Sequence, residues 1–509
     1  MDDLTLIAAS GIALPAQSFQ ARHLIGGAWR DSTDGAVSER MSPAHGVVVS
    51  RAAKGGVIEV DAAVAAAKAA FAAWSRLPGK ARGAVLLKVA DLIEANVERM
   101  AVLETLETGK PISQSRGEVS GAADLWRYAA ALGRVSHGDT HNALGEEMLA
   151  VVLKEPRGVV SVICPWNFPI WILSQKLPFA LAAGCTCVVK PSELTPSTTV
   201  LLGELLIEAG LPAGVVNIVL GYGEPVGSRM VQHPDVDMVT FTGSTVVGRA
   251  IAAAAGSGLK KVALELGGKN PQVVFPDADL DCAADAVVFG VYFNAGECCN
   301  SGSKVIVHAD VAEAFVARVV ARVVALSRKV AFGDPLNETT QVGAIVTPAH
   351  GRKIDGYVQA AVRAGARVAL GGGALQVQGL AGDFYQPTVV TGVTPDMAIA
   401  REEVFGPVLA VLTFRDIDEV ITLANDASYG LSAGVWSENV HTCLEFGRRV
   451  QAGTIWTNTW MDGFAEVTFG GMKQSGLGRE IGSYGLDEFL EVKSLVMRVG
   501  RTRANWVRG

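Results

Sequence analysis

Apolar positions recur at helical spacing after a short leading segment. From Val60 to Trp74 they fall on one helical face, with Asp61 as a candidate N-cap, and the pattern resumes at Gly83. It stops at the Gly-Lys-Pro sequence that begins at Gly109, because glycine and proline commonly end helices. The pattern therefore predicts two long helical stretches before residue 110.

From Gly158 onward, short β-branched runs alternate with helical stretches. Five of these runs are predicted strands: Val159–Ile163, Thr186–Lys190, Val215–Leu220, Met238–Thr242 and Lys261–Leu266. Strands that alternate with helices indicate a parallel, doubly wound sheet. Such sheets bind ligands beyond the carboxyl ends of their strands.

A second series of strands and helices begins at Gln272–Phe275 and continues with Lys304–Ala309 and a helix over Val311–Leu326. It predicts a second α/β domain after about residue 268. Two outlying strand-like segments, Met148–Lys154 and Phe489–Val499, have no local partner. We expect them to form an arm that pairs across subunits.

Composition narrows the class of protein. The 509 residues are 49% hydrophobic and 19% charged, which is typical of a globular chain and not of a disordered one. The 44 basic and 51 acidic side chains give a net charge of −7 without a basic run, which argues against nucleic acid and anionic membranes as partners. The longest apolar run, Ala286–Phe293, is too short to span a bilayer, and the first residues carry no basic region of a secretory signal. We expect a cytoplasmic protein.

The seven cysteines are an odd number spread over a long chain, which indicates reduced thiols. Cys185 and Cys187 alternate within a predicted strand, and without a nearby histidine they predict no metal site. Cys164, Cys282 and Cys443 are expected to be small core residues.

Cys298 and Cys299 lie in a glycine-flanked polar loop, Phe293–Ser303. A thiol in such a loop is reachable and can act as a nucleophile, although two semi-buried thiols without a function are an alternative. Glu265 ends an apolar strand just before two glycines. Desolvation there raises the pKa of a carboxylate and suits a general base, unless Glu265 pairs with a lysine such as Lys269.

Two glycine-rich segments each follow a predicted strand and open a helix. Gly221–Gly227 spaces its glycines as GxGxxxG, and Gly243–Arg249 lacks the lysine of a Walker A loop. Backbone N–H groups at a helix N-terminus suit a pyrophosphate, and ordinary strand-to-helix turns are the alternative.

These motifs together resemble the NAD(P)-dependent aldehyde dehydrogenases, from about Leu24 to Leu495. The two most specific motifs are LELGG at Leu264–Gly268 and FNAGECC at Phe293–Cys299. The remaining motifs follow in the order of that family: Pro165–Pro169, Lys190–Glu193, Phe241–Thr245, Glu402–Val408 and Phe469–Glu480.

The resemblance implies an α/β fold with a doubly wound, Rossmann-like cofactor domain, an α/β catalytic domain and a small β oligomerisation arm. The expected ranges are 1–135 and 157–267 for the NAD-binding domain, 268–480 for the catalytic domain, and 136–156 and 481–509 for the arm and tail. It also implies a homodimer or a homotetramer built as a dimer of dimers.

In the family that this chain resembles, the second cysteine after the Gly-Glu pair is the nucleophile, which selects Cys299 over Cys298. Its thiolate would attack the aldehyde, and the side-chain amide of Asn167 with the Cys299 backbone N–H would stabilise the oxyanion. Hydride transfer would leave a thioester, which water activated by Glu265 would hydrolyse to the acid.

The resemblance implies NAD as the cofactor. Lys190 and Glu193 would hold the adenine-side ribose, and the carboxylate would repel the 2′-phosphate of NADP, which would bind with lower affinity. Ser244 and Trp166 would contact the pyrophosphate, and Glu403 the nicotinamide ribose. The other implied cofactor residues are Ile163, Pro165, Gly223, Gly243, Gly248, Leu266 and Phe405.

The substrate segment departs from the family pattern. Members that act on small aliphatic or quaternary-amine aldehydes often carry a tryptophan eight residues after the catalytic asparagine, where this chain has Gln175, with Trp171 nearer. The expected pocket residues are Phe168, Trp171, Gln175, Cys298, Trp460, Met461, Asp462, Phe464 and Phe469. Asp462 with an aromatic wall resembles betaine-aldehyde and aminoaldehyde members. Asp462 as the cap of a turn is the alternative, and aromatic aldehydes and semialdehydes stay open.

Two rival functions remain on the same fold. A CoA-acylating semialdehyde dehydrogenase would pass the acyl group to CoA, but such members usually lack the general base, and Glu265 is present here. A non-catalytic homologue is the other rival, and the intact Cys299, Glu265 and Asn167 argue against it.

Overall fold

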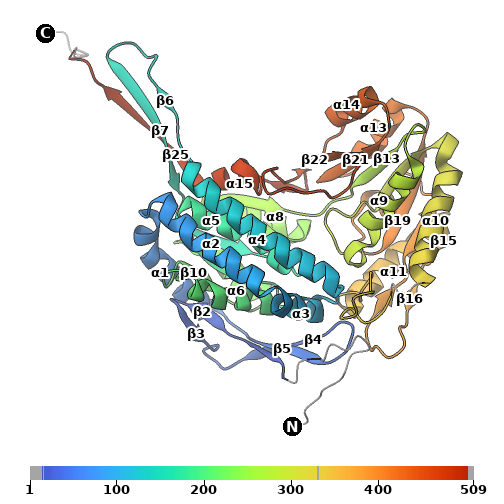
Figure 1. Cartoon of the computed structure of the whole chain (residues 1–509), viewed down its shortest axis with the longest axis horizontal. Helices are drawn as coiled ribbons and strands as arrows, with labels where there is room; N and C mark the ends of the chain where they lie inside the picture. Colours follow the sequence, from blue (N-terminus) through green and yellow to red (C-terminus); the bar gives the residue numbers. More distant parts are fainter. Residues whose placement is uncertain (1–13, 15–16, 329–331, 502–509) are drawn as a thin grey trace.

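The computed structural model describes residue 14 and residues 17–328 and 332–501. Figure 1 shows two lobes and a projecting arm. The outer ends of the predicted first and last ranges, residues 1–13 and 502–509, lie outside the described residues.

The first lobe is built on an eight-stranded sheet in the order β24-β12-β11-β8-β9-β10-β2-β3. Its parallel centre consists of β8 (Val159–Ile163), β9 (Thr186–Lys190), β10 (Val216–Ile218), β11 (Met238–Thr242) and β12 (Lys261–Glu265). These are the five predicted strands. Most of their side chains are buried, as expected of parallel strands that are covered on both faces. The antiparallel outer strands are β24 (Gly476–Leu477) at one edge, and β2 (His23–Ile25) followed by β3 (Ala28–Arg30) at the other.

Helices cover the faces of this sheet (Figure 1). They are α1 (Val57–Ser75), α2 (Gly79–Ala95), α3 (Val97–Thr108), α4 (Ile112–Val135), α5 (Pro169–Ala183), α6 (Ser197–Glu208), α7 (Ser228–Gln232) and α8 (Thr245–Ser257). Asp61 is not the cap of α1, because the Glu59 carboxylate accepts the Gly56 N–H at 2.8 Å and the helix begins after Gly56. The end predicted at Gly109 is confirmed by its left-handed φ of +85°.

Helix α4 was not predicted. It begins directly after Pro111, which the sequence pattern marks as an end, because proline also suits the first positions of a helix. Its buried face carries Val119, Leu125 and Trp126, and the Trp126 indole donates to Ser174 Oγ of α5 at 3.0 Å. This helix later supplies one wall of the site.

The second lobe contains a seven-stranded sheet in the order β15-β18-β19-β14-β13-β21-β22. Its strands are β13 (Pro271–Val274), β14 (Lys304–His308), β15 (Arg367–Leu370), β18 (Thr388–Thr391), β19 (Val408–Phe414), β21 (Ser432–Trp436) and β22 (Thr454–Thr457). The main helices are α9 (Leu280–Tyr292), α10 (Ala312–Arg328), α11 (Pro348–Arg363), α13 (Ile417–Asn425) and α14 (Val440–Arg449). The predicted second α/β unit is therefore present.

The arm is a three-stranded antiparallel sheet of β6 (Thr140–His141), β7 (Met148–Pro156) and β25 (Leu490–Arg498), which projects from the first lobe (Figure 1). The two outlying segments pair with each other within one chain, which corrects the expectation that they lack a partner of their own. Two predicted boundaries differ from the structure. Strand β24, expected in the catalytic range, pairs with β12 of the first sheet. Helix α15 (Gly482–Glu488), expected in the arm and tail, is packed into the core of the first lobe through Leu486.

A smaller sheet of β1 (Phe19–Ala21), β5 (Val48–Ala53) and β4 (Val37–Met41) lies beside α3 and α6. Among the described residues, no helix has both the length and the apolar character needed to cross a membrane. All seven cysteines are free. Cys282 is exposed on α9, which corrects the expectation of a core position, and its thiol donates to the capping carboxylate of Asp279.

Candidate active site

A crevice opens where the strand order of the first sheet reverses. From β8 the chain order continues to β9 on one side and to β11 on the other, and a cavity of about 230 Å³ lies at this point. Residues at or just after the ends of β8 and β11 line it: Pro165, Trp166, Asn167, Thr242, Gly243 and Ser244. Doubly wound sheets bind ligands in this position, because loops diverge there from neighbouring strand ends.

The second lobe supplies the opposite wall of the crevice with His350, Lys353, Glu403 and Phe405. The Trp166 ring meets the Phe405 ring edge-on at 5.6 Å and the His350 ring at 5.9 Å. His350 Nε2 lies 2.6 Å from the Phe405 carbonyl, which holds Phe405 at an unusual φ of +60°. The aromatic contacts thus join the two lobes at the crevice.

Glu403 places a carboxylate in this crevice. Its Oε1 accepts the Gly268 N–H at 3.0 Å, which fixes the side chain. Removal from water raises its pKa to about 7, and the charges of Lys353 and Lys269 act in the opposite direction. The group can therefore accept hydrogen bonds from a ligand.

Several other predicted cofactor residues lie outside the crevice lining. Lys190, which is buried, pairs with Glu193 at 3.7 Å beyond the end of β9. Gly223 is exposed in the turn after β10, and Ile163 is buried in β8. Gly248 packs α8 on the strand β12, because a Cβ there would collide with the side chain of Leu266, which itself lines the crevice.

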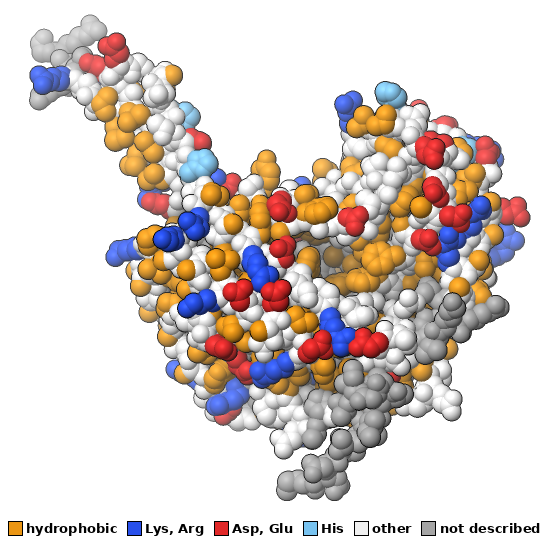
Figure 2. Space-filling view, viewed as in Figure 1, with side chains coloured by type: hydrophobic (Ala, Val, Ile, Leu, Met, Phe, Trp, Pro, Cys, Tyr) orange, Lys and Arg blue, Asp and Glu red, His pale blue; other side chains and the backbone are white. Residues whose placement is uncertain are grey.

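A second cavity, which we call the pocket, has a volume of about 470 Å³. Its apolar lining consists of Leu125, Phe168, Trp171, Ile172, Phe289, Phe293, Trp456, Met461, Phe464, Ala465, Phe469 and Ile481. In Figure 2, hydrophobic side chains border the hollow between α4 and α9. Pockets of this size and character suit small organic molecules.

Seven of the predicted pocket residues lie in this lining: Phe168, Trp171, Gln175, Cys298, Met461, Phe464 and Phe469. Trp460 and Asp462 do not, which corrects the expectation. Trp460 is buried in the core of the second lobe, with its ring centroid 4.8 Å from that of Trp456. The Asp462 carboxylate accepts a hydrogen bond from the Thr459 hydroxyl. The chain turns at Met461, whose φ is +63°, and the alternative of Asp462 as a turn residue fits this geometry.

Crevice and pocket meet at Cys299. Among the lining residues that the structure describes, Cys299 and Ile172 belong to both cavities. The loop before Cys299 takes a left-handed course, with φ of +49° at Asn294 and +72° at Gly296. Gly296 is required there because a Cβ would collide with the carbonyl oxygen of Gly406.

The loop is anchored on both sides of Cys299. Asn270 Nδ2 donates to the Cys299 carbonyl at 2.7 Å and to the Ser301 carbonyl at 3.0 Å. Cys298 is buried and Cys299 is partly exposed, so the second thiol is the more reachable one. A hydrogen bond with Cys298, followed by burial, raises the pKa of the Cys299 thiol well above its usual value. Attack on an aldehyde therefore requires that this thiol first lose its proton.

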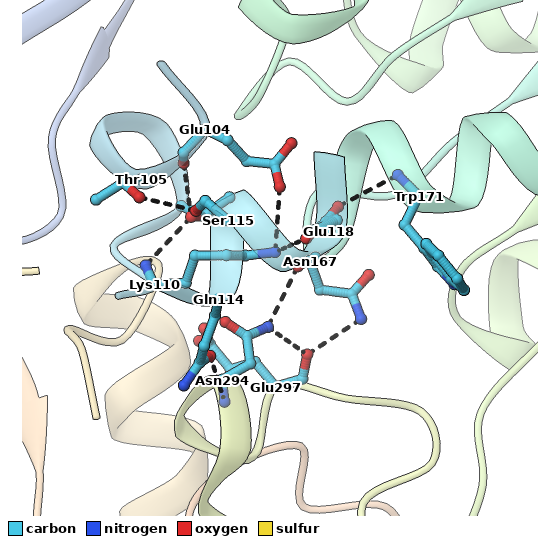
Figure 3. A network of polar contacts seen from close by, with 11 residues as sticks. Glu104, Thr105, Lys110, Gln114, Ser115, Glu118, Asn167, Trp171, Asn294 and Glu297 are labelled. Carbon is cyan, nitrogen blue, oxygen red and sulfur yellow. Dashed lines mark hydrogen bonds and ion pairs between the residues drawn. The ribbon is translucent and has the colours of Figure 1, made fainter. Parts of the chain in front are cut away.

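Asn167 follows β8 and faces the same loop. Its Nδ2 donates to the Glu297 carbonyl at 3.1 Å, and Asn294 Nδ2 donates to the carbonyls of Asn167 and Glu297 at 3.2 and 3.1 Å (Figure 3). An amide nitrogen carries two N–H groups, so the second one of Asn167 is left to donate to another acceptor.

Glu265, at the end of β12, is buried, and neither oxygen of its carboxylate has a hydrogen-bond partner in the structure. Burial raises its pKa to about 8, while the charges of Lys176 and Arg479 lower it. The alternative of pairing with Lys269 is wrong, because neither Glu265 oxygen has a hydrogen-bond partner and Lys269 Nζ donates instead to Ser303 Oγ at 3.3 Å. An unpartnered carboxylate of this pKa can accept a proton near neutral pH.

Sequence reasoning missed several residues of the site. His350 and Lys353 lie in an ordinary helical stretch that carries no motif, so nothing in the pattern singles them out. Glu118 of the pocket lies on α4, which was not predicted. Asn270 follows the LELGG motif by two residues and Asn294 lies inside the FNAGECC motif, so the presence of these two amides next to the specific motifs was the available signal.

This arrangement defines a class of protein: a doubly wound α/β enzyme in which a nucleotide-type crevice and an apolar pocket share a cysteine. A model of the aldehyde dehydrogenase family matches residues 29–495. The chain therefore belongs to the aldehyde dehydrogenase family.

Individual relatives match this chain over nearly its full length. Betaine aldehyde dehydrogenase of Bacillus subtilis is 39% identical over 485 residues, which cover 95% of this chain and 98% of that protein. The crystal structure of an NAD-dependent aldehyde dehydrogenase from Sinorhizobium meliloti is 48% identical, with a TM-score of 0.93 and coverage of 96% and 97%. Betaine aldehyde dehydrogenase from Staphylococcus aureus in complex with NAD+ is 36% identical, with a TM-score of 0.92 and coverage of 96% of both chains.

Proposed function

We propose that this protein oxidises aldehydes to carboxylic acids with NAD, and that Cys299 carries the acyl group between the two halves of the reaction. The observation that carries the proposal is the position of Cys299 in the lining of both cavities. An aldehyde in the pocket and a nicotinamide in the crevice would meet at this one sulfur atom. Membership of the aldehyde dehydrogenase family supports the same reaction.

The crevice fits a dinucleotide. It lies at the reversal of strand order, and α8 begins at its wall with Ser244 as N-cap, so backbone N–H groups face the place where a pyrophosphate would lie. Ser244 and Trp166 would hold the pyrophosphate, and Glu403 the nicotinamide ribose beside Phe405. When bound, NAD supplies the acceptor for the hydride. Relatives from Staphylococcus aureus were solved with NAD+.

Lys190 and Glu193 would hold the adenine-side ribose. Their ion pair at 3.7 Å leaves the partly exposed carboxylate of Glu193 able to accept from ribose hydroxyls. The same negative charge would repel a 2′-phosphate, which supports a preference for NAD, with NADP bound more weakly.

In the first half of the reaction, the Cys299 sulfur attacks the aldehyde carbon after its proton has left. The free N–H of Asn167 and the Cys299 backbone N–H would stabilise the oxyanion of the thiohemiacetal, and an amide suits this task because it donates without carrying a charge. The carbon then loses a hydride, the carbonyl reforms, and a thioester on Cys299 remains.

In the second half, Glu265 would take a proton from a water molecule that attacks the thioester. Its unpartnered oxygens and its pKa of about 8 support this role. The tetrahedral intermediate releases the carboxylic acid and returns the thiol of Cys299.

The test measures both products. Purified protein with NAD and an aldehyde is expected to give NADH and free carboxylic acid in equal amounts. If CoA is required and an acyl-CoA forms instead, the hydrolytic half is wrong. If no aldehyde of a broad panel raises the NADH absorbance, the protein is a non-catalytic member of the family.

We also propose that the arm joins subunits into a homodimer or a dimer of dimers. Strand β25 is a nine-residue sheet edge, and its side chains Val492 and Val496 are 61% and 65% exposed. An exposed apolar edge of this length pairs readily with another strand. Light scattering of the purified chain is expected to show a dimer or tetramer, and Val496→Asp is expected to shift it toward smaller species.

A further inference from the structure

The pocket has almost no charge to offer to a substrate. Among its described lining residues, Glu118 is the one ionisable carboxylate. That carboxylate is already engaged: one oxygen accepts the ammonium of Lys110, and the other accepts the Trp171 backbone N–H at 3.3 Å (Figure 3).

The groups behind Glu118 complete a neutral network. Lys110 Nζ lies 3.5 Å from Glu104 Oε1 and 4.2 Å from the centre of the Phe168 ring. Burial raises the pKa of Glu104 well above its usual value, which favours the uncharged form of this second carboxyl. With Glu104 uncharged, the ammonium of Lys110 and the carboxylate of Glu118 balance each other beneath the aromatic wall.

A cationic tail would find no counter-charge in this pocket. Asp462 lies outside the lining and bonds the Thr459 hydroxyl. Phe168 is stacked with Phe293 at 5.9 Å and already lies near the ammonium of Lys110, which would repel a second cation. Quaternary ammonium groups can bind to aromatic faces alone. Here, however, the Phe168 face lies near the Lys110 ammonium, and the lining carboxylate of Glu118 is already engaged, so little compensates for removing a second cation from water.

The volume favours a large tail. About 470 Å³ is roughly three times the ~150 Å³ of a cavity that accepts one benzene molecule. A two-carbon aldehyde would leave most of this apolar surface without contact, whereas a bicyclic ring or a long aliphatic chain would bury it.

We propose that the preferred substrates are uncharged aldehydes with a large apolar tail, and that trimethylammonium and amino aldehydes are poor substrates. The inference rests on the proposed function, since it concerns the pocket beside the same cysteine. It differs from the substrate that the names of several relatives state.

The first experiment compares betaine aldehyde with 3,3-dimethylbutanal, its neutral carbon isostere, on the wild-type protein with saturating NAD. We expect kcat/KM, corrected for the hydrated fraction of each aldehyde, to be at least about 10-fold higher for the neutral molecule. Along acetaldehyde, benzaldehyde and 2-naphthaldehyde it is expected to rise by at least about 100-fold in total. Preference for betaine aldehyde, or a falling series, overturns the proposal.

The second experiment adds the missing charge. Gln175→Glu places a carboxylate in the lining, and we expect it to raise the betaine-to-isostere ratio of kcat/KM at least about 10-fold. Asp462→Asn is the matched control outside the lining, and the ratio is expected to stay constant. An unchanged ratio in Gln175→Glu overturns the placement of the substrate tail in this pocket. A selective loss of kcat/KM for betaine aldehyde in Asp462→Asn would show that Asp462 is the counter-charge, and it would overturn the proposal.

The outcomes separate the two proposals. NADH formation with preference for cationic aldehydes overturns the substrate class and leaves the oxidation of aldehydes in place. Absence of NADH with every aldehyde overturns the proposed function, and the substrate class with it.

Discussion

Replacement of Glu265 by glutamine is expected to separate the two halves of the proposed reaction. Burial raises the pKa of this carboxyl to about 8, and hydrolysis needs its ionised form. At pH 6 a group of this pKa is about 1% ionised, and at pH 9 it is about 90% ionised. The rate constant of thioester hydrolysis should therefore fall about tenfold for each pH unit below 8 in the wild-type protein.

Glutamine has nearly the same shape as glutamate, but its amide oxygen is too weakly basic to take a proton from water. In Glu265→Gln we expect hydrolysis to be slowed by roughly 10²–10⁴-fold and to be independent of pH between 6 and 9. Quenched-flow sampling with mass spectrometry follows the thioester on Cys299 directly. This matters because the raised pKa of the Cys299 thiol gives NADH formation a pH dependence of its own.

A matched control is Glu107→Gln. Burial raises the pKa of Glu107 to about 7, but its carboxylate bonds Ser50 and Ser197 and lies outside both cavities. The control is expected to keep the fall of hydrolysis below pH 8. If Glu265→Gln hydrolyses its thioester at the wild-type rate, or keeps the same pH dependence, Glu265 is not the base.

Four further outcomes are expected. Cys299→Ala should abolish NADH formation while Cys298→Ala retains much of it, and the opposite pattern in an NADH assay would reverse the assignment. Asn167→Ala should slow the first NADH phase by about 10²–10³-fold in stopped flow, because one oxyanion donor is lost; an unchanged phase would remove that role. Glu193→Ser should raise the NADP-to-NAD ratio of kcat/KM, and a constant ratio would contradict the ribose contact. The folded state holds the Glu265 proton up to about pH 8 and the unfolded chain up to about 4.5, so ionisation costs stability as pH rises through this window. Glu265→Gln should therefore melt at a higher temperature than wild type at pH 9, with the difference narrowing toward pH 5 in calorimetry.

Much of the fold follows from the sequence pattern. Most side chains of the five central strands of the first sheet are buried, so their sequences are short, mainly apolar runs, and three of the strands have the predicted bounds. Helix α4 was missed because the segment from Gly109 to Pro111 both ends α3 and begins α4, and the sequence pattern was interpreted only as an end. The position of β24 was missed because a two-residue edge strand carries no periodicity.

The site was predictable where a residue type is rare in its setting. Glu265 is a carboxylate in an apolar strand, and Cys299 is a thiol in a polar loop, so both were singled out from local context. The prediction placed Asp462 in the pocket wrongly, because the direction of its side chain depends on the backbone turn at Met461, which the sequence pattern does not encode. His350 lines the crevice because the two lobes come into contact there, and a contact between residues so far apart in the chain cannot be predicted from the local sequence pattern.

The meeting of crevice and pocket at Cys299 and Ile172 has an evolutionary consequence. Within the described lining, all other residues belong to one cavity or the other, so mutations that reshape the pocket wall on α4 or after β22 leave the crevice wall untouched. Substitutions at a few pocket positions can therefore change which aldehydes are accepted during evolution, while the residues that carry the redox chemistry stay the same. Protein engineers can therefore vary pocket and crevice positions separately, and additive effects are expected for the positions that lie far from the shared Cys299 and Ile172.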